Sequence, residues 1–260
     1  MGGGVDMDFK KLSFSNRQGV ELAARMDLPD EGKPAAYVIF AHCFTCSKDL
    51  KAPANISRAL TRAGLAVLRF DFTGLGESEG EFSDSNFTTQ VSDLLDAAGF
   101  LRDTYEAPQI LVGHSLGGAA VLQAASEIRS VRAVAVIGAP RDAAHVLTHL
   151  TDARGEIEAR GEARVQLGGR PFRIKKQFID DLESHQMHET IAGLNRALMI
   201  LHSPFDAVVG INNAADIFMA ARHPKSFVSL DKADHLLSDA ADSQYAGTII
   251  AVWAERYISA

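Results

Sequence analysis

Apolar and polar positions vary along this chain with two periods, one typical of buried strands and one typical of amphipathic helices. Short, nearly continuous apolar runs predict strands covered on both faces, and they fall at 35–42, 65–72, 107–113, 131–140 and 196–204. Helical spacing predicts helices at 53–64, 87–105, 116–128, 211–222 and 241–258. A last strand is predicted at 225–230, so strand and helix alternate along most of the chain.

Strands that alternate with helices indicate an α/β fold, in which a mostly parallel central sheet has helices on both faces. The start of the chain is different, because period-two alternation at 9–15 and 20–29 predicts an antiparallel hairpin there. The chain contains no internal repeat, and we expect residues 5–260 to form a single domain.

The segment 141–195 interrupts this alternation. It contains two short β-like runs about a Gly-Gly turn, in "EARVQLGGRPFRI", between charged helical pieces. So long a segment between two strands of one sheet is more than a simple connection. We expect an inserted cap over one edge of the sheet, although a surface insertion without a role in the site is an open alternative.

Composition and charge exclude several classes of protein. Hydrophobic residues make up 47% of the chain and the formal charge is −7, so a nucleic-acid partner is not expected. No apolar run is as long as a membrane span, which needs about 18 residues, and the N-terminus lacks the pattern of a secretory signal. Two cysteines cannot form a disulfide framework in a chain of this size, and we expect a cytoplasmic protein with no membrane partner.

The stretch "GHSLGG" at 113–118 has the pattern G-x-S-x-G. Ser115 follows the apolar run "QILV" and opens a predicted helix, which is the strand-turn-helix context of a nucleophile elbow. Gly113 and Gly117 are required there because side chains would collide with the neighbouring strand and helix, and the helix N-terminus favours negative charge. Ser115 is therefore the predicted nucleophile, and the alternative is a turn that merely caps a helix.

A serine nucleophile needs a base, and the base needs a carboxylate to hold it. In this architecture both follow the nucleophile along the chain, each after a strand. His235 comes after the strand 225–230 and is the predicted base, and Asp206 comes after the strand 196–204 and is the predicted acid. Asp142, after the strand 131–140, is the alternative acid. Asp231 and Asp234 lie too near His235 in the chain to support its ring from a separate strand.

Acyl transfer also needs backbone N–H groups that stabilise an oxyanion. Leu116, directly after the nucleophile, is predicted to supply one, and Phe44, in the loop "AHCFTCSKDL" after the first buried strand, the other. The same loop holds Cys43 and Cys46 in a C-x-x-C spacing. A zinc site would need more ligands than these two cysteines, and a thioredoxin-like motif occurs in a smaller domain. We therefore interpret the spacing as a coincidence.

Over its whole length the chain resembles the α/β-hydrolases, and more narrowly their cinnamoyl/feruloyl-esterase-like branch. The resemblance lies in "HCFTCSKD", "DFTGLGES", "GHSLGG" and "DHLLS". "RFDFTGLGESEG" and "ARHPKSFVSLDKADHLLS" are similar to the hydrolase half of bifunctional α/β-hydrolase/OsmC-type proteins, which implies a covalently linked OsmC-type domain in a longer chain. Cys43 departs from the wider family, which has glycine at this place. A regulatory oxidation of Cys43 or Cys46 that switches the oxyanion hole off is a hypothesis from their position.

These residues and the resemblance predict a serine carboxylesterase that hydrolyses a small-molecule ester without a metal or an organic cofactor. Ser115 would attack the carbonyl, His235 would transfer the proton and Asp206 would orient the imidazole. The predicted cap would shape the pocket, with Phe172 and Val208 as candidate wall residues. A thioesterase, a lactonase or a peptidase would use the same residues, and a C-x-x-C redox module is a further alternative.

Overall fold

The computed structural model describes residues 9–44, 46–167 and 169–258. Gly168, one half of the predicted Gly-Gly turn, and the ends of the predicted domain at 5–8 and 259–260 lie outside the described residues. Within the described ranges, none of the helices is both long and apolar enough to cross a membrane.

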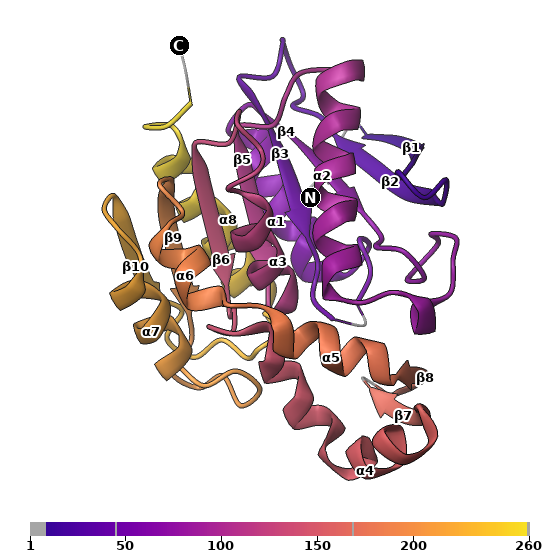
Figure 1. The fold of residues 1–260 in the computed structure, drawn as a ribbon. Coiled ribbons are helices and arrows are strands. Elements are labelled where there is room, and N and C mark those ends of the chain that lie inside the picture. Colours follow the sequence, from indigo (N-terminus) through magenta and orange to yellow (C-terminus); the bar gives the residue numbers. More distant parts are fainter. Residues whose placement is uncertain (1–8, 45, 168, 259–260) are drawn as a thin grey trace.

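Eight strands form the central sheet (Figure 1). Their order across the sheet is β1 (Phe9–Ser15), β2 (Glu21–Asp27), β4 (Leu65–Phe70), β3 (Ala36–Ala41), β5 (Ile110–His114), β6 (Ala133–Ile137), β9 (Ala197–His202) and β10 (Lys225–Ser229). β1 and β2 form the predicted antiparallel hairpin, and β2 also pairs with β4 in the antiparallel sense. All the other pairings in this sheet are parallel, so the predicted mostly parallel sheet is confirmed.

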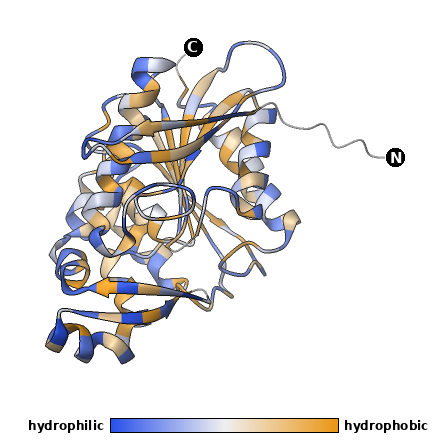
Figure 2. Ribbon diagram, turned by 90° about the vertical axis from the view of Figure 1, so that its right-hand side faces the viewer, coloured by the Kyte–Doolittle hydropathy of each residue, from blue (hydrophilic) through white to orange (hydrophobic). Residues whose placement is uncertain are grey.

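Helices cover both faces of the sheet because its inner strands are apolar on both sides. α1 (Lys51–Arg62) and α8 (Ala240–Ala254) pack on one face, and α2 (Phe87–Thr104) and α3 (Leu116–Ala124) pack on the other. Successive side chains of a strand point to opposite faces, so Ile39 belongs to the core under α2 and α3 while Val38 and Phe40 belong to the core under α1 and α8. Figure 2 shows mainly hydrophobic residues along the central strands and a mixture of hydrophobic and hydrophilic residues along the surrounding helices.

Most of the predicted insertion follows β6 as a compact unit. It contains the 3₁₀ segment η2 (Ala143–Leu150), α4 (Thr151–Arg160), the antiparallel hairpin β7 (Glu162–Leu167) and β8 (Arg170–Lys175), α5 (Lys176–Ser184) and α6 (Met187–Ala192). Figure 1 shows α4, α5 and the hairpin together at one end of the molecule. Val146, Ile157 and Leu182 are buried in the same core that lies under α2 and α3, so the segment is packed onto the main body. The chain then returns to the sheet at β9, and α7 (Asn212–Ala220) connects β9 to β10.

Candidate active site

Ser115 occupies a tight turn between β5 and α3. Its φ of 54° and ψ of −126° lie outside the regions that residues with a side chain normally adopt. The Ser115 N–H donates to the carbonyl of Ile137 at 2.9 Å, and its carbonyl accepts from the N–H of Gly118 at 2.8 Å, so both sides of the turn are fixed. A Cβ atom at Gly113 or Gly117 would overlap backbone atoms of the neighbouring segments, which explains the two glycines of the motif.

The structure brings together the three side chains that the sequence predicts as nucleophile, base and acid. His235 Nδ1 lies 2.7 Å from Asp206 Oδ2, and His235 Nε2 lies 3.0 Å from Ser115 Oγ. Because a carboxylate only accepts, Nδ1 carries the proton and Nε2 is free to accept the serine proton. The three residues follow β5, β9 and β10, whose carboxyl ends meet at one edge of the sheet because these strands are parallel.

Asp206 is held as a carboxylate by its own loop. Its Oδ1 accepts the N–H groups of Val208 at 2.9 Å and of Val209 at 2.8 Å, which leaves Oδ2 for His235. Burial by itself raises the pKa of Asp206, but the hydrogen bonds from His235 and from the two amides outweigh it, and the pKa lies below its ordinary value. The carboxylate is therefore charged at neutral pH and can stabilise a protonated His235.

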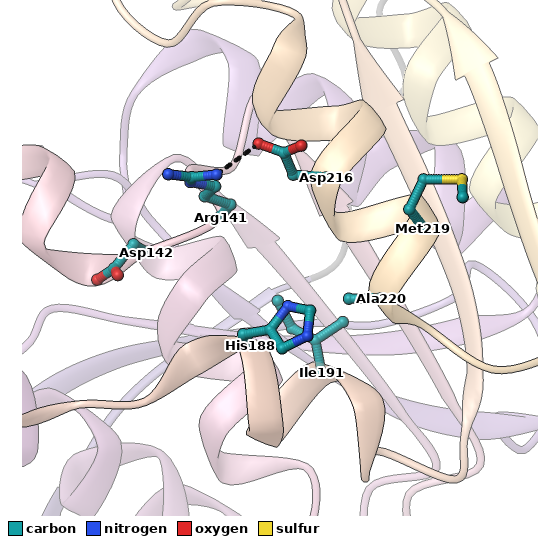
Figure 3. A pocket seen from close by; sticks show the side chains of 7 residues that line it. All are labelled: Arg141, Asp142, His188, Ile191, Asp216, Met219 and Ala220. Atoms are coloured by element: carbon teal, nitrogen blue, oxygen red, sulfur yellow. Dashed lines mark hydrogen bonds and ion pairs between the residues drawn. The ribbon is translucent and has the colours of Figure 1, made fainter.

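Asp142, the alternative acid, lies elsewhere. Its carboxylate caps the η2 segment by accepting the N–H of Ala144 at 2.9 Å. It lines a second cavity of about 640 Å³, together with Arg141, which pairs with Asp216 at 2.9 Å (Figure 3). Neither Ser115 nor His235 lines that cavity. The geometry therefore favours Asp206 as the partner of His235.

Ser115 and His235 line a cavity of about 690 Å³, within the size range of small-molecule sites. Phe44 and Leu116, the predicted oxyanion residues, line it too, and neither backbone N–H donates to another described residue. Val208, a predicted wall residue, is also in the lining.

Phe172, the other predicted wall residue, is not among the residues that line this cavity. Its ring instead packs edge-on against Phe82, at a centroid distance of 5.0 Å. The segment 141–195 contributes six other residues to the lining: His145, Val146, His149, Gln166, Leu167 and Arg170. A sequence pattern could not single these out because they come from three separate elements of the segment.

Two further residues near the site were missed from the sequence. Gly138 follows β6 with φ +54°, and a Cβ there would lie 3.2 Å from Asp206 Oδ2 and 3.5 Å from His235 Nδ1. His114 is buried, and its Nε2 lies 2.7 Å from the backbone carbonyl of His235. Since a carbonyl only accepts, His114 Nε2 carries a proton and donates a hydrogen bond to the carbonyl of His235, the predicted base. Both residues follow from contacts between segments distant in the sequence.

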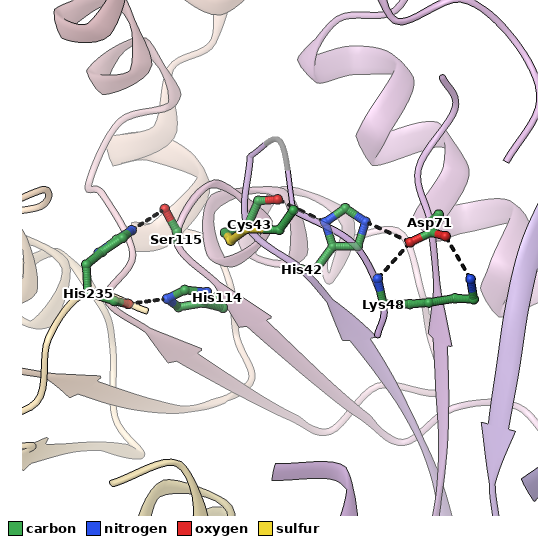
Figure 4. The surroundings of a disulfide bond; sticks show 8 residues. His42, Cys43, Lys48, Asp71, His114, Ser115 and His235 are labelled. Carbon is green, nitrogen blue, oxygen red and sulfur yellow. Dashed lines mark hydrogen bonds and ion pairs between the residues drawn. A yellow bond between two sulfur atoms is a disulfide. The ribbon is translucent and has the colours of Figure 1, made fainter. Parts of the chain in front are cut away.

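The loop 41–50, called the oxyanion loop here because it holds the predicted donor Phe44, contains both cysteines. The structure does not support the interpretation of their spacing as a coincidence. Cys43 and Cys46 form a disulfide, with Cα atoms 5.3 Å apart (Figure 4). Both cysteines line the cavity with Ser115. Among the residues that the structure describes, no group of three or more His, Cys, Asp or Glu side chains could hold a metal ion.

The fold and this site together define a hydrolase with a serine at a strand-turn-helix elbow. Residues 38–248 match the model of the alpha/beta hydrolase family, and the chain belongs to that family. This membership confirms the predicted fold class and agrees with the resemblance found in the motifs.

Known proteins similar to this chain include an esterase domain and a thioesterase. A solved structure of the esterase domain from a Rhodothermus marinus protein is 52% identical, has a TM-score of 0.80 and matches 97% of this chain and 100% of that one. The palmitoyl-protein thioesterase ABHD10, mitochondrial, of Mus musculus is 30% identical over 89% of this chain and 78% of its own. Est1E from Butyrivibrio proteoclasticus, solved with ferulic acid bound, shares the fold with a TM-score of 0.80 at 18% identity, over 93% of this chain and 98% of that one.

Proposed function

We propose that the protein is a serine carboxylesterase. The observation that carries the proposal is the continuous hydrogen-bonded chain from Ser115 Oγ through His235 to Asp206, which opens onto a cavity of about 690 Å³. The similarity to the Rhodothermus marinus esterase domain, at 52% identity over 97% of this chain, supports the same class of reaction.

In this mechanism Ser115 Oγ attacks the ester carbonyl while His235 Nε2 takes the serine proton. The oxyanion of the tetrahedral intermediate accepts the N–H groups of Phe44 and Leu116, and Asp206 stabilises the protonated imidazole. His235 then protonates the leaving alcohol, and the acyl group remains on Ser115. In the second half of the reaction His235 takes a proton from a water molecule, which attacks the acyl group. His235 then returns the proton to Ser115 Oγ, and the free acid leaves.

Hydrolysis of p-nitrophenyl acetate, butyrate and octanoate by the wild type and by Ser115→Ala tests the proposal. We expect kcat to fall by at least about 10³-fold in the variant, because the nucleophile is lost while the cavity remains. Ser126→Ala, an exposed serine beyond α3, is the matched control and should keep full activity. Equal turnover by wild type and Ser115→Ala would contradict the proposal.

A thioesterase is the second candidate, and the similarity to ABHD10 of Mus musculus favours it. Both reactions use the same intermediate, so the triad does not separate them. The separating measurement is kcat/KM for a matched pair, an oxygen ester and a thioester of the same acyl group with leaving groups of similar size. The ratio of the two kcat/KM values is divided by the ratio of the uncatalysed rates. A result of more than about tenfold for one substrate identifies the class of substrate.

The role of the 141–195 segment as a cap is part of the proposal. It is supported by the six side chains that the segment contributes to the cavity. Cytoplasmic location, the small-molecule ester substrate and a linked OsmC-type domain stay predictions from the sequence.

A further inference from the structure

We propose that the Cys43–Cys46 disulfide, in the wall of the cavity that contains Ser115, is a site of thiol–disulfide exchange. Dithiol reductants reach this bond, and its reduction lowers the turnover of the enzyme. The two cysteines are joined in the loop after β3, and both line the cavity that contains Ser115. Figure 4 shows Cys43 between Ser115 on one side and His42 on the other. The effect on turnover rests on the proposed esterase function.

The disulfide encloses the residue that is proposed to donate to the oxyanion. Phe44 lies between the two cysteines in the chain, so the bond limits how far its amide can move. The Cys43 carbonyl also accepts from the N–H of Cys46 at 3.1 Å and from His42 Nδ1 at 2.9 Å. An amide that is already in position before the reaction stabilises the oxyanion without a cost of reorganisation.

The rest of the loop is fixed independently of the disulfide. Lys48 N–H donates to Asp71 Oδ1 at 2.7 Å, and Lys48 Nζ lies 2.8 Å from Asp71 Oδ2. The Phe44 ring stacks on Phe178 with a centroid distance of 5.6 Å. The bond closes only a short loop, and a short loop restricts the unfolded chain little. Reduction should therefore loosen the Phe44 amide while the fold stays intact. The direction is opposite to the hypothesis from the sequence, in which oxidation switches the oxyanion hole off, because here the disulfide holds the donor in place.

Access to the bond runs through the cavity. Cys43 is only 5% exposed, whereas Cys46 is half-buried and is the more exposed residue. A dithiol would attack Cys46 Sγ through one thiolate, forming a mixed disulfide and releasing Cys43 as a thiolate that takes up a proton. The second thiol then attacks the sulfur of the reductant, which releases Cys46 as a thiol. The dithiol is oxidised to its cyclic disulfide, and two electrons pass to the two cysteines.

The test compares two forms of the full chain. The oxidised protein and protein treated with dithiothreitol are each freed of reagent by gel filtration, because free thiols cleave p-nitrophenyl esters themselves. The thiols are counted with a chromogenic disulfide reagent, and kcat and KM are measured with p-nitrophenyl butyrate. We expect the thiol count to rise from zero to two and kcat to fall about tenfold, with KM nearly unchanged. Complete removal of one oxyanion donor lowers kcat by about 10²–10³-fold, and a donor that is only loosened should lower it less. Reoxidation with oxidised glutathione, followed by its removal, should restore kcat.

Cys43→Ser/Cys46→Ser should have the kcat of the reduced form and should not respond to dithiothreitol. Circular dichroism should show the same fold in the variant and in both forms of the wild type. Diethyl p-nitrophenyl phosphate, which leaves a diethylphosphoryl group on Ser115 inside the cavity, should slow the appearance of thiols in the wild type.

Equal kcat for fully oxidised and fully reduced protein would overturn the proposal, as would a disulfide that dithiothreitol does not reduce without denaturant. If the wild type shows no hydrolysis dependent on Ser115 in either form, the proposed function fails instead. The thiol count then still decides whether the exchange site exists.

Discussion

Ser115 has an unfavourable backbone conformation, and this conformation places its side chain within hydrogen-bond distance of His235. With φ at 54° and ψ at −126°, a residue with a Cβ is strained by about 1–3 kcal/mol. The hydrogen bonds of its N–H and carbonyl hold it there, and the result is that Oγ lies 3.0 Å from His235 Nε2. The strain therefore positions the hydroxyl.

A comparison of Ser115→Gly with Ser115→Ala tests this strain. Both variants lack the hydroxyl, but only glycine adopts a positive φ without cost. We expect Ser115→Gly to have a free energy of unfolding about 1 kcal/mol above that of Ser115→Ala, measured by urea denaturation. A glycine variant less stable than the alanine variant would show that the turn is relaxed.

His114 contacts the backbone of His235, the predicted base. Burial first, and then the neighbouring His235, lower the pKa of His114 to about 4, so the ring is neutral at pH 7. Its Nε2–H donates to the His235 carbonyl at 2.7 Å, and without this bond the His235 loop would be less well fixed.

His114→Phe keeps the ring shape and removes the donor. We expect kcat to fall about tenfold with little change in KM, since only the geometry of proton transfer is affected. His114→Gln, whose side-chain amide can donate from a similar place, should recover most of the loss. Equal losses in the two variants would mean that packing, and not the hydrogen bond, is what matters.

At the scale of elements, the site depends on how closely α3 approaches the end of β3. A Cβ at Gly117 would overlap the carbonyl oxygens of Ala41 and His42, so the first turn of α3 touches the backbone directly. This contact holds the elbow beside the oxyanion loop.

Gly117→Ala should therefore lower the free energy of unfolding by about 2–3 kcal/mol and lower kcat, because helix and loop must move apart. Gly155→Ala is the matched control, since a Cβ at Gly155 in α4 meets open space. This variant should be stabilised by up to about 1 kcal/mol, the helix preference for alanine over glycine. Thermal unfolding of both proteins checks the pair, and similar shifts in both would rule out the close contact.

At the scale of the molecule, the sheet edge that holds the site encloses several neutral histidines. His42, His114 and His202 are buried, and burial is the main cause that lowers the pKa of each. The unfolded chain binds protons at these groups below about pH 6.5, whereas the folded chain does not until lower pH. Their contribution to stability is therefore complete at high pH and declines as the pH falls.

Urea denaturation at about pH 7.5 and about pH 5.5 measures this linkage. We expect the free energy of unfolding to fall by about 1 kcal/mol from His114 alone, with further losses from the other two residues. His114→Gln should reduce the difference between the two pH values, and His188→Gln, on an exposed residue, is its matched control. A free energy that is constant over this range would contradict neutral burial.

Much of the fold follows from the sequence because it depends on local patterns. Apolar runs of strand length predict the inner strands, and the observed elements differ from the predicted ranges mainly at their ends. The order of elements places Ser115, Asp206 and His235 after strands of a parallel sheet, and this alone predicts that they share an edge. Glycines beside Ser115 indicate the elbow because only a residue without a side chain fits there.

The tertiary structure decided what depends on distance between segments far apart in the chain. It separated Asp206 from Asp142, because only one of them reaches His235. It also showed that residues of the 141–195 segment other than Phe172 line the cavity. The bond between Cys43 and Cys46 likewise depends on loop geometry that a C-x-x-C spacing does not specify. The sequence by itself determined the type of fold and the chemistry-bearing residues, and three-dimensional packing determined their partners, because partners are set by contacts and not by order along the chain.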